Sequence, residues 1–154
     1  TRASLFYRDI ESWGGDLPHG VGMELFWDPS IKDGVGIGGT TPASLVERWH
    51  EETGEPLNQG IGYSYMAAQV LFNAIEKAGT LDGAEVNKAL GETDMITMYG
   101  RVMFDKETQF HRFPVQFGQW RKVDKPWKWE SPVVFSFNEN IPATAELIFP
   151  MPYD

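Results

Sequence analysis

Residues 60–79 form the stretch that most constrains the fold of this 154-residue chain. Apolar side chains recur there at intervals of three and four positions, a spacing that places them on one face of an α-helix. These side chains are Met66, Ala67, Val70, Leu71, Ala74, Ile75 and Ala78. Because three of them are alanines, another element can approach this face closely. Gly79 follows where helices commonly end in a left-handed residue, so we predict a helix from Gly60 to Gly79.

One further helix is predicted on each side of it. Thr41 precedes Pro42 and is expected to be the N-cap of a helix that ends at Gly54. Asp82 is the predicted N-cap of a shorter helix that ends at Gly91. The chain therefore carries three consecutive helices.

The strand signals lie before and after these helices. Residues 21–27 alternate, with Val21, Met23, Leu25 and Trp27 on one face. Short β-branched and aromatic runs predict further strands at 101–104, 114–121, 132–137 and 145–149. This order predicts an α/β or α+β layout. One strand before three helices is too little sheet to cover them, so the chain by itself looks incomplete.

Composition excludes several classes of function. The formal net charge is −9, which argues against nucleic acid as a partner because phosphates are bound by Lys and Arg. The chain has no cysteine, which excludes disulfides, thiolate metal sites and a cysteine nucleophile. No run approaches the roughly 20 apolar residues of a membrane span. The chain begins without methionine, as a processed protein or a fragment would.

Candidate enzyme chemistry is sparse. The glycines at residues 34–39 match the pattern of a dinucleotide-binding loop, but Asp28 and Pro29 separate them from the preceding strand, so we interpret them as a flexible loop. His19, His50 and His111 are not spaced as a helical zinc pair, and His50 is expected to be solvated. Spacing leaves a Ser-His-Asp site open, although no nucleophile elbow is present. No metal or cofactor is predicted.

The remaining candidates are aromatic. Phe26 and Trp27 end the first strand, while Tyr63 and Tyr65 lie in the first turn of the 60–79 helix. Strand ends and helix N-termini are where open α/β folds bind ligands. Each tyrosine could equally pack with a hydrogen-bonded hydroxyl. The Trp127-Lys-Trp129 segment is expected to pack within a hairpin.

Four segments in order resemble a known family. They are Asn73 to Gly79, Asp82 to Leu90, Gly100 to Asp105, and Gln119-Trp120. With the spacing of Gly15, Gly20, Trp27 and Pro29, they resemble the substrate-binding proteins of branched-chain amino-acid-type ABC transporters, which have the type I periplasmic binding fold. The resemblance covers most of residues 12–132 and corresponds to the C-terminal portion of such a protein.

The resemblance implies an α/β fold in which three helices and short strands are shared between two lobes. Residues 1–27 would end the second lobe, residues 28–116 would form part of the first, and residues 117–154 would return to the second lobe with a C-terminal extension. The helices would then pack on strands that this chain does not contain.

The implied function is that of a non-catalytic, extracytoplasmic solute-binding component of an importer. It would bind an amino acid or a related small carboxylate or amide between the lobes and deliver it to a membrane permease, in the periplasm or tethered outside the cell. Family members line the cleft with the start of the tyrosine-containing helix, which corresponds to Gln59, Ile61 and Tyr63, with Phe26 and Trp27 as the further candidates. Depending on the alignment gap, Ile61 or Tyr63 takes the usual aromatic position. The alternatives are a ligand-sensing receptor domain of the same fold, or a small α/β enzyme using His111 or His50.

Overall fold

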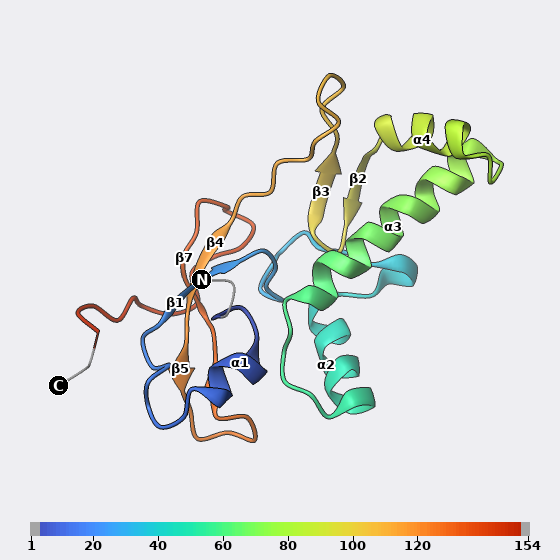
Figure 1. Ribbon diagram of the computed structural model, residues 1–154. Coiled ribbons are helices and arrows are strands. Elements are labelled where there is room, and N and C mark those ends of the chain that lie inside the picture. The colour runs from blue at the N-terminus through green and yellow to red at the C-terminus, as the bar shows by residue number, and fades with distance from the viewer. Residues whose placement is uncertain (1–3, 152–154) are drawn as a thin grey trace.

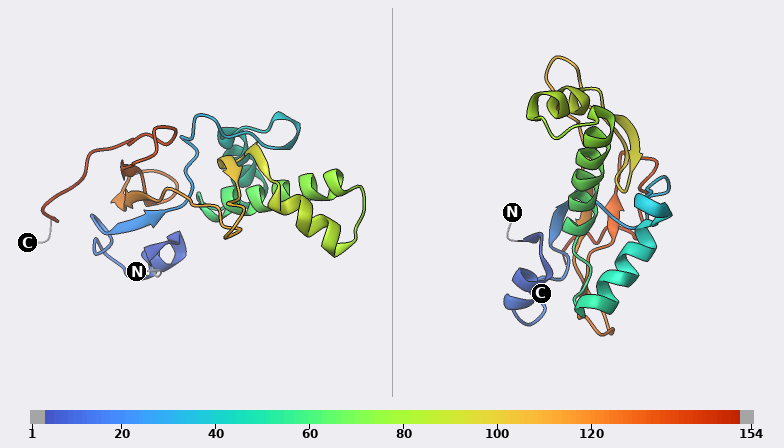
Figure 2. Two further views of the ribbon diagram at one scale, coloured as in Figure 1. Left: turned by 90° about the horizontal axis from the view of Figure 1, so that it is seen from above. Right: turned by 90° about the vertical axis from the view of Figure 1, so that its right-hand side faces the viewer.

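The structure is a computed structural model that describes residues 4–151, and its elements form two bodies (Figure 1). The helix body contains α2 (Pro42–Thr53), α3 (Gly60–Ala78), α4 (Gly83–Gly91), β2 (Asp94–Thr97) and β3 (Gly100–Met103). The sheet body contains α1 (Tyr7–Ser12), β1 (Gly22–Leu25), β4 (Gln116–Gln119), β5 (Arg121–Lys122), β6 (Trp129–Glu130) and β7 (Val133–Phe135). Seen from above, the two bodies lie on opposite sides of a narrow junction (Figure 2).

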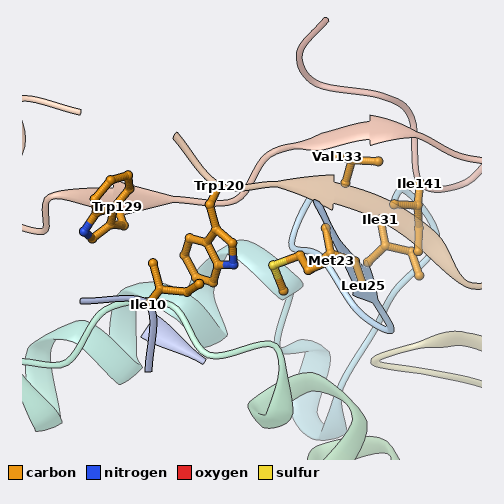
Figure 3. Close-up of a cluster of buried hydrophobic side chains, with 8 residues drawn as sticks. All are labelled: Ile10, Met23, Leu25, Ile31, Trp120, Trp129, Val133 and Ile141. Atoms are coloured by element: carbon orange, nitrogen blue, oxygen red, sulfur yellow. The ribbon is translucent and has the colours of Figure 1, made fainter. Parts of the chain in front are cut away.

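The sheet body is held together by strands that are distant in sequence. β1 pairs with β4 and β4 pairs with β7, all antiparallel, while β5 and β6 form a separate hairpin. The sheet packs against α1 and against the segment that follows β7, through Ile10 and Ile141. Trp120 donates a hydrogen bond from Nε1 to the Ser4 carbonyl at 2.6 Å. The buried core consists of Ile10, Met23, Leu25, Ile31, Trp120, Trp129, Val133 and Ile141 (Figure 3).

The helix body is built around α3. Its buried core consists of Trp27, Met66, Val70, Met98, Tyr99 and Val102. Gly62 allows the closest approach, because a Cβ at that position would lie 2.0 Å from the Trp27 indole. Helix α4 packs on α3, and β2 and β3 form an antiparallel hairpin beside it. None of the helices within residues 4–151 has both the length and the hydropathy needed to cross a bilayer.

The predicted helix ends are confirmed. The Thr41 side chain accepts a hydrogen bond from the Ser44 amide, and Gly54 ends α2 in the left-handed region with φ of 68°. Asp82 accepts from the amides of Ala84 and Glu85 at the start of α4. Gly79 ends α3 with φ of 64°. These signals are local, which is why sequence alone located them.

Several predicted strands and loops differ from the structure. The first strand ends at Leu25 because the Phe26 amide bonds to the Gln59 side chain instead of a neighbouring strand. Residues 145–149 form no strand and are held instead by the Gln119 side chain. The glycine segment is a loop, as interpreted, and it contains a short 3-10 turn, η2 (Ile37–Gly39). Its backbone bonds to Thr97 and Thr40.

The short elements α1, β2 and β6 were not predicted. α1 has six residues, β2 has four and β6 has two. Runs of this length carry too few residues to show a helical or alternating period. Trp129 does pack within the β5–β6 hairpin, as expected, where it is buried opposite Lys122.

Candidate functional site

The N-terminal end of α3 lies at the junction of the two bodies, beside the end of β1 (Figure 1). Gln59 immediately precedes α3 and is only 6% exposed. Its Oε1 accepts a hydrogen bond from the Phe26 amide at 2.7 Å, and its Nε2 donates to the Glu24 carbonyl at 3.4 Å. The Gln59 amide therefore ties the start of α3 to the end of β1, and both of its polar atoms are engaged.

Trp27 and Ile61 also have structural contacts. Trp27 is 1% exposed, and its Nε1 donates to the Met98 carbonyl at 3.0 Å. Ile61 is half-buried and packs against the core of the helix body. Tyr65, the second tyrosine of the first turn, accepts a hydrogen bond on its hydroxyl from the Ile37 amide at 3.1 Å. It thereby anchors the glycine loop.

Phe26 and Tyr63 are the two predicted residues that line a cavity. Their rings pack edge to face with centroids 6.4 Å apart. The cavity has a volume of about 400 Å³ and is bounded by Phe26, Tyr63, Met66, Ala67, Tyr99 and Phe113. We call it the aromatic cavity. Its lining contains no charged side chain, so it suits an apolar group rather than an ion.

Tyr99 is a residue of this site that sequence reasoning missed. Its ring packs edge to face on Phe113, with centroids 4.7 Å apart. Its hydroxyl is buried without a hydrogen-bond partner among the described residues. Burial raises the pKa of Tyr99 above its ordinary value, so the hydroxyl stays protonated at neutral pH. The sequence signal was absent because Tyr99 reaches the cavity only through the fold of the β2–β3 hairpin.

A groove continues from the aromatic cavity along α3. It has a volume of about 500 Å³ and shares Met66, Ala67 and Phe113 with the cavity. Leu71 and Phe110, which also line it, are 43% and 71% exposed. Part of the apolar face predicted for this helix therefore has no cover among the described residues.

A second hollow, the interbody cleft, separates the bodies beside the same end of α3. It has a volume of about 660 Å³. The sheet body contributes α1 and the β5–β6 connection, including Arg8, Glu11 and Trp127. The helix body contributes Trp49 and the α2–α3 turn, including Asn58. Unlike the aromatic cavity, this cleft is lined by charged side chains of both signs.

The histidines occupy separate environments. His19 accepts a hydrogen bond on Nδ1 from the Lys122 amide at 3.1 Å, and the Nδ1 of His111 lies 3.1 Å from the Met103 carbonyl oxygen. The expectation that His50 is solvated was wrong, because its ring packs on Trp127 and its Nε2 is buried. Within residues 4–151, no three His, Asp or Glu side chains are grouped so as to hold a metal ion.

No protein-family model matches the sequence, and neither does any curated protein. Solved structures do match the fold. A leucine-binding protein from Thermotoga maritima aligns over 84% of this chain and 34% of its own, with 20% identity and a TM-score of 0.61. A periplasmic binding protein from Burkholderia mallei aligns over 92% of this chain and 36% of its own, with 13% identity and a TM-score of 0.63.

A third match is a solute-binding protein of an ABC transporter from Rhodopseudomonas palustris, solved with 3,4-dihydroxybenzoic acid. It aligns over 84% of this chain and 34% of its own, with 18% identity and a TM-score of 0.61. The chain spans about a third of the length of these structures, which fits the predicted C-terminal portion. The chain therefore has part of the two-lobed type I periplasmic binding protein fold.

Proposed function

We propose that this chain forms part of a non-catalytic solute-binding protein that delivers a small molecule to an ABC importer. The observation that carries the proposal is the aromatic cavity at the junction of the two bodies, where the first turn of α3 meets the end of β1. A solute held at such a junction can be enclosed by movement of one body against the other. The structural neighbours are solute-binding proteins, which supports the same class of function.

The ligand we propose is an amino acid or related small carboxylate with an apolar body. The apolar lining around Phe26 and Tyr63 suits the apolar part. Two of the structural neighbours, a leucine-binding protein and a protein solved with 3,4-dihydroxybenzoic acid, have ligands of this character. Because the cavity lining includes no cation, the carboxylate would be bound by groups outside it. Of the five residues predicted from sequence, Phe26 and Tyr63 are the ones we propose as direct contacts.

We further propose that strands of the fold outside this chain cover the groove on α3.

We also propose that residues 1–27 and 117–154 belong to the second lobe and residues 28–116 to the first. Support comes from the two separate cores, one in each body. Trp27 packs in the core of the helix body and Ile31 in the core of the sheet body, so the two bodies interlock at the proposed first boundary. The remaining partner would be a membrane permease, and the site of action would be outside the cytoplasm.

The test is ligand-induced stabilisation of the protein produced from its complete gene. L-leucine and 3,4-dihydroxybenzoate are added separately and the melting temperature is followed. A ligand at 100 times its Kd stabilises by about 2.7 kcal/mol, which raises the melting temperature measurably. Tyr63→Ala should reduce this shift by weakening binding.

Tyr65→Phe is the matched control, because the Tyr65 hydroxyl bonds to the Ile37 amide rather than lining the cavity. It should lower the melting temperature slightly and leave the ligand-induced shift intact. If no amino acid or small carboxylate stabilises the protein, the ligand class is wrong. If a ligand binds but Tyr63→Ala binds it equally well, the aromatic cavity is not the site.

A further inference from the structure

One ring contact joins the two bodies beside the interbody cleft. His50 lies in the last turn of α2, and Trp127 lies in the connection between β5 and β6. Their ring centroids are 4.4 Å apart and the planes are inclined at 45°. Nε2 of His50 is buried without a hydrogen-bond partner among the described residues, so the ring is held by packing. Trp127 also lines the cleft.

The junction between the bodies is held differently. There Gln59 bonds to both Phe26 and Glu24, as described above. Shortly after β1, where the chain passes from the sheet body to the helix body, the Lys32 amide donates to the Asn140 carbonyl at 2.9 Å. The Asn140 side chain donates to the Asp33 carboxylate at 2.8 Å. Directional hydrogen bonds therefore fix the bodies where the chain passes between them.

The contact across the cleft has no such support. Between α2 and the β5–β6 hairpin, the described residues provide this ring contact and no hydrogen bond or ion pair. Two bodies joined firmly along one side can still rotate about that side. A contact on the other side then determines how far apart the walls of the cleft stand.

We propose that His50 and Trp127 form a clasp that sets the separation of the two bodies and thereby the width of the interbody cleft. Both are positioning residues in this role. Two packed rings separate more easily than the partners in a network of buried hydrogen bonds. The clasp can therefore open without unfolding either body. The clasp acts on the placement of the bodies, whether or not the proposed solute binds.

The test measures the distance between the bodies by energy transfer between two dyes. The chain has no cysteine, so Glu47→Cys on α2 and Asp124→Cys on the β5–β6 connection give two unique labelling sites, both exposed. Trp127→Ala and His50→Ala each remove one side of the clasp. Trp13→Ala is the matched control, because Trp13 is half-exposed at the end of α1 and does not line the cleft. Excess unlabelled protein prevents transfer between molecules.

Each clasp variant should lose transfer efficiency relative to the parent, and the double variant should lose no more than either single one. Trp13→Ala should match the parent. His50→Ala provides the independent arm because it leaves the hairpin sequence intact, and circular dichroism checks that each variant keeps its helices. Unchanged efficiency in both single variants would overturn the clasp. So would a loss in only one of them, or an equal loss in Trp13→Ala.

Discussion

The side-chain amides of three buried glutamines bond to backbone N–H and C=O groups, as the peptide group of a neighbouring strand would. Gln59 joins α3 to β1, as described above. Gln69 donates to the Val35 carbonyl at 3.0 Å and accepts from the Met98 amide at 2.7 Å. Gln119 donates to the carbonyls of Gly20 and Ile148 and accepts from the Ile148 amide. A glutamine carries one acceptor and two donor hydrogens, so it can satisfy two separate backbone segments at once.

Gln69→Leu should therefore destabilise the protein strongly. The leucine fills a similar volume but leaves the Met98 amide and the Val35 carbonyl without their partner. We expect a loss of at least about 2 kcal/mol, since each unsatisfied buried group costs roughly 1–3 kcal/mol. Urea denaturation with a constant m-value measures the change. The control Glu76→Leu lies on the exposed side of the same helix and should stay within about 0.5 kcal/mol. A Gln69→Leu protein as stable as the parent would show that this amide bridge has no structural role.

Helix α3 makes one especially close approach to the rest of the helix body. Gly62 lies against the Trp27 indole, which enters the core of the helix body from the end of β1. The indole in turn bonds to the Met98 carbonyl in the β2–β3 turn. Helix α3, the end of β1 and the β2–β3 turn are thus connected through Gly62, Trp27 and Met98. Only glycine fits at position 62. Gly83, in the first turn of α4, has open space where a Cβ would be.

The same substitution at these two glycines should have opposite effects. Gly62→Ala forces its Cβ against the Trp27 ring and should destabilise by about 1–3 kcal/mol, the usual cost of overpacking a core. Gly83→Ala meets no neighbour and should stabilise by about 0.4–1 kcal/mol, because the unfolded chain loses freedom. Thermal unfolding of both variants measures the difference. Equal changes at both positions would contradict the close packing of α3 on Trp27.

At the scale of the whole molecule, two cores are formed but each body keeps an apolar face uncovered. On the helix body this face is the groove beside α3, with Leu71 and Phe110 exposed. On the sheet body, Phe117 and Phe135 are opposite each other on neighbouring strands and are 41% and 50% exposed. Exposed apolar patches of this kind promote association between molecules.

The 154-residue chain should therefore self-associate. Sedimentation velocity should show a weight-average mass that rises with concentration. Leu71→Ser combined with Phe110→Ser should shift the distribution toward monomer, because it removes apolar area from the groove. Leu81→Ser is the control, since Leu81 is 83% exposed but does not line the groove. A parent chain that stays monomeric at all concentrations would contradict this prediction.

The extent of the α3 apolar face shows what sequence could and could not predict. Met66, Val70 and Ala74 are buried as predicted, but Ala67 and Leu71, on the same predicted face, are exposed. The helical period of a sequence identifies which side chains share a face. It does not indicate whether another element covers that face. For the site, the sequence named Phe26 and Tyr63 as candidates, and the structure brings their two rings together. It could not foresee Tyr99 and Phe113, which lie 36 or more positions further along the chain and reach the cavity through tertiary contacts.

The sequence by itself determined helices α2, α3 and α4 and their ends, because capping side chains, left-handed glycines and apolar periods act within a few residues. It also excluded cysteine chemistry outright. Only the tertiary structure decided that Gln59 and Trp27 serve as internal supports while Phe26 and Tyr63 line a cavity. Only the tertiary structure brought His50 onto Trp127. These outcomes depend on which distant segments meet, and that follows from the packing of the whole chain rather than from any local pattern.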